Sequence, residues 1–218
     1  MRDAKLTPVV FPTSRKLQDD IRSLETPLDP PGEVSPRDSI VSMSFDPQTY
    51  GEPVAAILHL EEAGQRLMPL VSTRAGADRA RQTIRQAGAR QLFPQSRAPE
   101  AAMAGLYLYF DCWTQAHETA QDIATPEGSY WHAIVHRREP DAENSAYWFR
   151  QVAAHAIFPA LRDAAAEIGV PVGPRWNPQA FIDLCERARL CPGSELERQA
   201  RAVQRAEWQL LFDYCARP

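Results

Sequence analysis

The sequence is poor in lysine, in paired cysteines and in long apolar runs. Lys5 and Lys16 are the only lysines among 24 basic residues. The net charge is −4 and the isoelectric point about 5.8, so there is no basic patch of the kind that nucleic-acid binding requires, and we expect no nucleic-acid partner. No apolar run approaches the roughly 18 residues of a membrane span, and the N-terminus lacks the apolar segment of a secretory signal.

The four cysteines form no recognisable pairs. They are Cys112, Cys185, Cys191 and Cys215, and none belongs to a C-x-x-C motif. A chain of 218 residues is long enough to fold without disulfide bonds. We therefore expect four reduced thiols in a cytoplasmic protein. A local disulfide between Cys185 and Cys191 is the less favoured alternative.

Common catalytic motifs are missing as well. The sequence contains no G-x-G-x-x-G, no P-loop, no G-x-S-x-G nucleophile elbow and no H-E-x-x-H zinc motif. None of these signatures therefore identifies a function, and any site has to be inferred from the spacing of individual residues.

The sequence does contain a helical pattern. Its 44% hydrophobic and 24% charged residues are ordinary for a globular protein. From residue 51 onward, apolar residues recur at helical spacing between prolines and glycines that begin or end helices. We predict an all-α fold, with residues 51–218 forming a single-domain multi-helix bundle of about seven to nine helices. Residues 1–50, with six prolines before residue 37, are predicted to form a proline-rich, mostly irregular arm.

Two segments of this arm show weak patterns. Leu17, Ile21 and Leu24 have the spacing of a short amphipathic helix over residues 14–25. Residues 40–45 alternate in polarity, which is typical of a short strand or of an extended arm. We expect the arm to run along the surface of the core that the later helices form.

The helices in the middle of the chain determine which polar side chains can meet. The longest helical pattern runs from about Pro99 to about Ala124 and ends at residues 125–128, Thr-Pro-Glu-Gly. A second, short helix is predicted over residues 129–139 and is closed by Pro140. Because only about four residues connect the two helices, they should pack antiparallel as a hairpin.

Three of the five histidines lie on this predicted hairpin. At about 100° per residue, His132, His136 and Glu139 share one face of the second helix, and His117 lies within the apolar stripe of the first. The same projection turns the acidic side chains of the first helix to its opposite side: Asp111, Glu118 and Asp122. The other two histidines stand alone and are interpreted as structural: His59 and His155.

The three clustered histidines are candidate metal ligands. Two imidazoles one turn apart on a buried helix, with a third from a neighbouring helix, suit zinc, iron or manganese, so His117, His132 and His136 are assigned to a divalent metal. His132, His136 and Glu139 also form a candidate catalytic acid/base group, because histidines titrate near neutral pH and a carboxylate fixes their tautomer. The alternative is that the buried histidines only hydrogen-bond carbonyl or carboxylate groups.

Arginines near the histidines suggest an anionic ligand. Guanidinium groups bind carboxylates and phosphates bidentately, so Arg137, Arg138 and Arg150 are the candidate substrate-binding residues. The alternative assigns at least two of the three to salt bridges with acidic residues nearby in the sequence: Glu127, Glu139, Asp141 and Glu143.

Two stretches resemble segments of a protein family. The segments are EGSYWHAIVHRREPDAENSAYWFRQV at 127–152 and VQRAEWQLLFDYC at 203–215. They are similar to segments of an uncharacterised family of bacterial and fungal proteins. The resemblance covers roughly the second half of the chain and implies no activity, cofactor or ligand.

The favoured function is an enzyme, or an enzyme-like site, that acts on a small polar or anionic molecule with a divalent metal or by acid/base chemistry. The alternative is a non-catalytic helical module that binds a ligand or a partner protein and contains structural histidines. The enzyme requires ring nitrogens of at least two histidines to converge. For a metal site, His117 must lie within about 10 Å of His132, because ligand nitrogens are about 2.1 Å from zinc.

Overall fold

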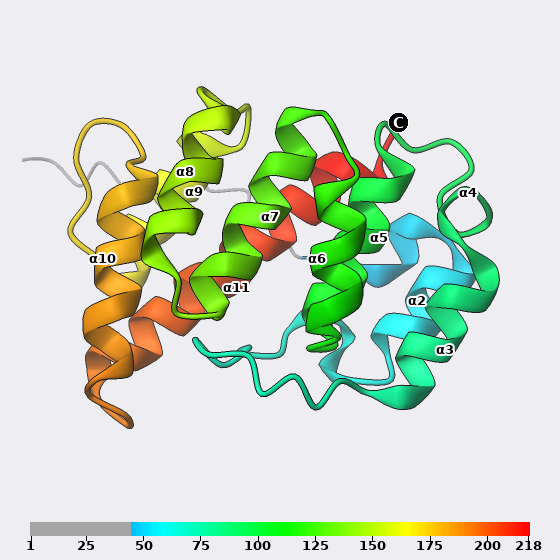
Figure 1. The fold of residues 1–218 in the computed structure, drawn as a ribbon, viewed down its shortest axis with the longest axis horizontal. Helices are drawn as coiled ribbons and strands as arrows, with labels where there is room; N and C mark the ends of the chain where they lie inside the picture. The colour runs from blue at the N-terminus through cyan, green and yellow to red at the C-terminus, as the bar shows by residue number, and fades with distance from the viewer. Residues whose placement is uncertain (1–44) are drawn as a thin grey trace, which may run out of the picture. The chain divides into compact units, whose positions relative to one another are not determined.

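The computed structural model describes residues 45–218, which form ten α-helices and two short 3₁₀-helices without a β-strand in that range (Figure 1). The all-α prediction is therefore confirmed for this part of the chain, and the expected seven to nine helices were too few. The helix predicted over residues 14–25 lies outside the described residues. So does the pattern at 40–45, apart from Phe45, which has no regular secondary structure.

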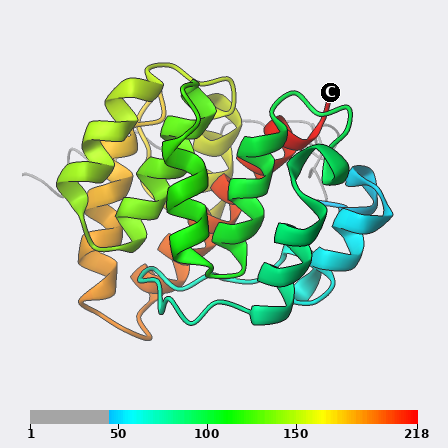
Figure 2. The same cartoon turned by 45° about the vertical axis from the view of Figure 1, so that its right-hand side comes forward.

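The helices follow one another through short connections. In chain order they are η1 Pro47–Tyr50, α2 Glu52–Leu58, η2 Glu62–Gly64, α3 Asp78–Ala87, α4 Ala89–Leu92, α5 Pro99–Tyr109, α6 Trp113–Gln121, α7 Pro126–Arg138, α8 Ala142–Val152, α9 Phe158–Ile168, α10 Pro178–Arg189 and α11 Glu195–Ala216. Figures 1 and 2 show α11 running diagonally behind α6, α7 and α8.

One extra helix arises from a break that the sequence pattern does not reveal. The segment predicted as a single helix over 99–124 is two helices, α5 and α6. Asp111 lies between them with φ 58°, in the left-handed region that interrupts a right-handed helix. Asp111 therefore does not point away from the core, as the projection of one continuous helix predicts, but is buried.

The hairpin formed by α6 and α7 is as tight as predicted. The two helices pack against each other, and α7 also packs against α5 and α8. Gly128, in the first turn of α7, allows this approach because a Cβ atom at that position would collide with the carbonyl oxygen of Ile123. Most of the circumference of α7 is buried, as its sequence indicates.

Residues 45–50 of the predicted arm contribute to this helical unit. They contain η1, and the Tyr50 side chain packs within the main hydrophobic cluster. Its hydroxyl donates a hydrogen bond of 2.8 Å to Asp213 on α11.

Two further expectations from the sequence concern membrane spans and disulfide bonds. None of the described helices is both long enough and apolar enough to cross a membrane. All four cysteines are free, so the alternative disulfide between Cys185 and Cys191 is not formed.

Two buried ion pairs hold the C-terminal end of α7. Arg137 pairs with Glu207 on α11, and their side chains are 1% and 0% exposed. Arg138 pairs with Asp111 across 2.8 Å and is fully buried. Two of the three candidate arginines therefore form salt bridges, as the alternative interpretation predicted. Their partners, Glu207 and Asp111, are distant in the sequence. The adjacent acids expected from the sequence are not the partners.

Removal of Arg137 should destabilise the fold strongly. Arg137→Met leaves the Glu207 carboxylate buried without its cation, so we expect a loss of about 3–5 kcal/mol in the free energy of unfolding. A second substitution, Glu207→Gln, removes the uncompensated charge and should recover part of that loss. Urea denaturation with circular dichroism measures both.

The matched control is the exposed pair of Arg81 and Asp78. Arg81→Met should cost less than about 1 kcal/mol, because exposed ion pairs contribute little. Equal losses for the buried and exposed substitutions would contradict the assigned role of the Arg137–Glu207 pair.

Candidate metal centre

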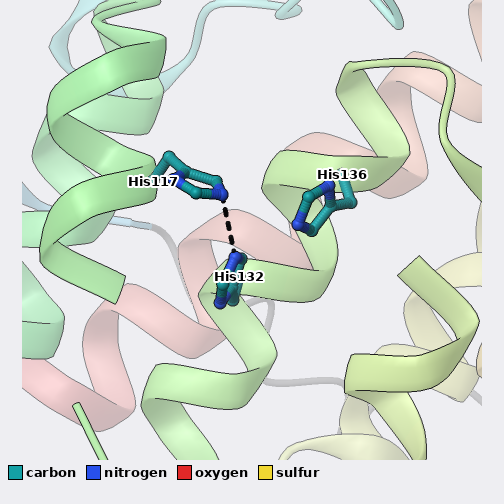
Figure 3. A group of neighbouring side chains, drawn as sticks. All are labelled: His117, His132 and His136. Atoms are coloured by element: carbon teal, nitrogen blue, oxygen red, sulfur yellow. Dashed lines mark hydrogen bonds between the residues drawn. The ribbon is translucent and has the colours of Figure 1, made fainter. Parts of the chain in front are cut away.

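Three histidines from two helices meet between α6 and α7 (Figure 3). His117 extends from α6, and His132 and His136 extend from α7. The Nε2 atoms of His117 and His132 are 3.0 Å apart. One ring nitrogen from each of the three histidines lies within 4.8 Å of the other two. The predicted approach of His117 to the histidines of the second helix is therefore confirmed.

One pair of these nitrogens has a spacing close to that in a metal coordination shell. Nitrogen ligands about 2.0–2.1 Å from a tetrahedral zinc ion are about 3.3 Å from each other. The 3.0 Å between the Nε2 atoms of His117 and His132 differs from this spacing by only a few tenths of an ångström. The same distance is also that of an ordinary hydrogen bond, with one imidazole donating and the other accepting.

Two tryptophans fix the orientation of the histidine rings. Trp113 stacks on His117 with ring centroids 5.0 Å apart, and Trp148 stacks on His132 at 4.1 Å. The His132 ring is also stacked on His136 at 4.8 Å. Trp113 precedes His117 by one helical turn, so its sequence spacing could have identified it. Trp148 comes from α8, and only the packing of α8 on α7 brings it to the site.

Burial keeps the two histidines of α7 uncharged. His132 is 2% exposed and His136 is 8% exposed. Burial, together with the neighbouring His136 and His117, lowers the pKa of His132 to about 4. Burial and His117 also lower the pKa of His136, against the opposing effect of Glu139 and Asp141. Both imidazoles are therefore neutral at pH 7, which is the form that binds a metal ion.

Glu139 lies behind His136 rather than among the converging nitrogens. Its Oε2 atom is 3.3 Å from Nδ1 of His136, and its other oxygen bonds Arg74. The contact is at ion-pair distance, and Nδ1 of His136 makes no hydrogen bond within the described residues. A carboxylate in this position can orient the ring of a metal-binding imidazole. Asp141 is also close to His136 and Glu139, but its carboxylate caps α8 by accepting hydrogen bonds from Asn144.

None of the three predicted substrate-binding arginines contacts this histidine cluster within the described residues. Arg137 and Arg138 are engaged in the buried ion pairs with Glu207 and Asp111. Arg150 is exposed on α8, with its guanidinium 5.8 Å from the ring of Tyr147. Their contacts therefore give no support to a substrate-binding role.

A different arginine contacts two neighbours of the cluster. Arg74 lies in the loop between η2 and α3, with its guanidinium 4.0 Å above the ring of Trp113. It also bonds Glu139, the partner of His136. No sequence spacing could have identified Arg74, because it is brought here by the tertiary path of its loop.

The two histidines interpreted as structural make hydrogen-bond contacts with backbone groups outside the cluster. His59 is exposed, and its Nδ1 atom is 2.7 Å from the carbonyl oxygen of Ala55. His155 is buried and accepts a hydrogen bond from the amide of Ile157.

Comparison with known proteins adds no identification. The chain matches no family model, and no match was found among curated proteins or solved structures. The resemblance of residues 127–152 and 203–215 to an uncharacterised bacterial and fungal family stays a prediction. The function therefore has to be argued from the geometry of the site.

Acidification should destabilise the metal-free protein through His132. Its pKa is about 4 in the folded state and 6.5 ordinarily, so the unfolded state binds more protons between these values. The free energy of unfolding should be highest above pH 6.5 and fall as the pH is lowered toward 4. Urea denaturation at a series of pH values measures this fall.

His132→Phe is the informative variant because it retains an aromatic ring against Trp148 and removes the titrating group. Its stability should fall less steeply between pH 6.5 and pH 4 than that of the unchanged protein. Equal slopes would show that His132 does not bind the additional proton on unfolding.

Proposed function

We propose that the protein is a metal-dependent enzyme in which His117, His132 and His136 hold one divalent transition-metal ion. The observation that carries the proposal is the convergence of one ring nitrogen from each histidine within 4.8 Å. Imidazole ligands suit zinc, copper, iron and nickel, whereas oxygen ligands suit magnesium and calcium. The neutral state of His132 and His136 at pH 7 supports the same proposal.

The three histidine ligands found among the described residues support catalysis over a structural role for the metal. Structural zinc sites have four protein ligands, whereas catalytic sites have three and keep one position for water or substrate. A metal ion held by three histidines would activate a water molecule or polarise an oxygen atom of a small polar or anionic substrate. Glu139 would orient His136. As part of this proposal, the free cysteines support a cytoplasmic location.

The second candidate is a non-catalytic helical module that binds a ligand or a partner protein. Two observations favour it. The 3.0 Å contact between His117 and His132 satisfies both Nε2 atoms as a hydrogen bond without a metal. Stacking by Trp113 and Trp148 accounts for the ring orientations. In this candidate function the histidines are structural.

Elemental analysis of the purified protein distinguishes these functions. We expect about one equivalent of a transition metal, and we expect it to be lost in His132→Ala and in His136→Ala. After the bound metal is removed with a chelator, added Co²⁺ or Ni²⁺ should quench tryptophan fluorescence, because Trp113 and Trp148 stack on two of the ligand rings.

His59→Ala is the matched control, because this exposed histidine lies outside the cluster, and it should retain the metal. A metal-free protein of full stability that takes up neither Zn²⁺ nor Co²⁺ would exclude the metal site. An acid/base role for His132, His136 and Glu139 would then be the remaining catalytic version.

Glu139→Gln should weaken metal binding by about 10–100-fold, because loss of a carboxylate partner reduces the basicity of the ligand imidazole and its fixed orientation. Competition titration with a chromophoric chelator measures the dissociation constant. Glu118→Gln, on the exposed side of α6, is the control and should leave the constant unchanged. A similar constant in both variants would argue against a contribution of Glu139 to the site.

A further inference from the structure

We propose that Arg74 orients the substrate of this site and that the substrate carries a carboxylate group. The inference rests on the proposed metal centre and specifies its ligand class. Among the arginines of the described range, Arg74 is the one whose contacts include direct neighbours of the clustered histidines.

Arg74 spans the outer edge of the cluster. On one side, its guanidinium lies over Trp113, which stacks on His117. On the other side, it bonds Glu139, which lies 3.3 Å from Nδ1 of His136. A ligand bound by Arg74 would therefore lie beside Trp113 and Glu139, which contact histidines from both helices of the hairpin.

The loop holds Arg74 in a fixed conformation. Arg74 has φ 56°, which non-glycine residues seldom adopt, and its amide donates to the Ser72 hydroxyl at 3.1 Å. The Ser72 amide donates to the carbonyl of Arg138 at 2.8 Å, and the Thr73 amide donates to Asp111 at 2.9 Å. Because Arg138 and Asp111 form a buried ion pair, the loop is attached to the core. Such preorganisation reduces the entropy lost when a ligand binds.

The guanidinium of Arg74 is also accessible. Its side chain is 52% exposed, whereas the Glu139 side chain is 29% exposed and the histidines of α7 are buried. A guanidinium has five N–H donors, and the contacts of Arg74 engage one terminal nitrogen and one face of the group. Among residues 45–218 the other donors have no partner, so a ligand arriving from solvent can accept hydrogen bonds from them.

The local charges favour a carboxylate over a phosphate. A guanidinium binds carboxylates and phosphates bidentately, so the charge of the ligand decides between them. The Glu139 carboxylate bonded to the same guanidinium would repel a phosphate dianion more than a monoanion. We therefore expect a small carboxylate as the ligand, with its carboxylate group held by Arg74 at the edge of the cluster.

The test uses the full chain loaded with Co²⁺, whose visible absorption reports a change of its ligands. Acetate is the probe, and inorganic phosphate is the comparison. Acetate should alter the Co²⁺ spectrum, and Arg74→Gln should weaken its apparent affinity by about tenfold or more, as expected for loss of a charged hydrogen bond. Arg74→Lys should be intermediate, because it keeps the charge without the planar fork.

Arg150→Gln is the matched control, because Arg150 is also exposed and also lies near an aromatic ring. It should leave acetate affinity unchanged. Circular dichroism should show that Arg74→Gln folds normally, and its Co²⁺ affinity should change by less than about threefold.

The outcomes separate the two proposals. Failure of the unchanged protein to bind Co²⁺ overturns both. Normal Co²⁺ binding with no acetate response, or with equal acetate affinity in Arg74→Gln, overturns only the role of Arg74. A loss of Co²⁺ affinity as large as that of Glu139→Gln would mean that Arg74 acts through Glu139 on His136. Tighter binding of phosphate than of acetate overturns the assignment to a carboxylate.

Discussion

The buried guanidinium of Arg138 connects the parts of the chain that surround the histidines. It donates to the carbonyls of Leu108 and Pro69 and to the carboxylate of Asp111. Burial lowers the pKa of Arg138 to about 10, so the group is still a cation at neutral pH. Burial alone would raise the pKa of Asp111, but the charge of Arg138 and the hydrogen bonds from Thr73 lower it below its usual value. The ion pair thus joins the end of α7, the break between α5 and α6, and the loop that carries Arg74.

Burial has two consequences for the histidine cluster. It favours neutral imidazoles at His132 and His136, whose lone pairs can then bind a metal ion. It also brings Trp113 and Trp148 against the rings, which limits their rotation. These features reduce the reorganisation required for a ligand to bind. The same contacts stabilise the metal-free arrangement of the rings.

The candidate site could be predicted from the sequence where the relevant contacts are local. His132 and His136 are one helical turn apart, and the short connection at residues 125–128 brings α6 back against α7. The position of Asp111 could not be predicted in this way. Its backbone leaves the helical region, and its carboxylate is bound by Arg138 and by the loop at Ser72 and Thr73. These partners lie far from Asp111 in the sequence: Arg138 is 27 positions away, and Thr73 and Ser72 are 38 and 39 positions away.

The sequence by itself determined the all-α class, the α6–α7 hairpin and the convergence of three histidines, because helical period and turn residues act over a few positions. Tertiary structure alone decided the partners of the charged groups. Arg137 and Arg138, adjacent on α7, turn to Glu207 and Asp111 on different elements, and Arg74 arrives from a distant loop. The physical reason is that a buried charge requires a partner in space, and the packing of the helices decides which carboxylate can reach it.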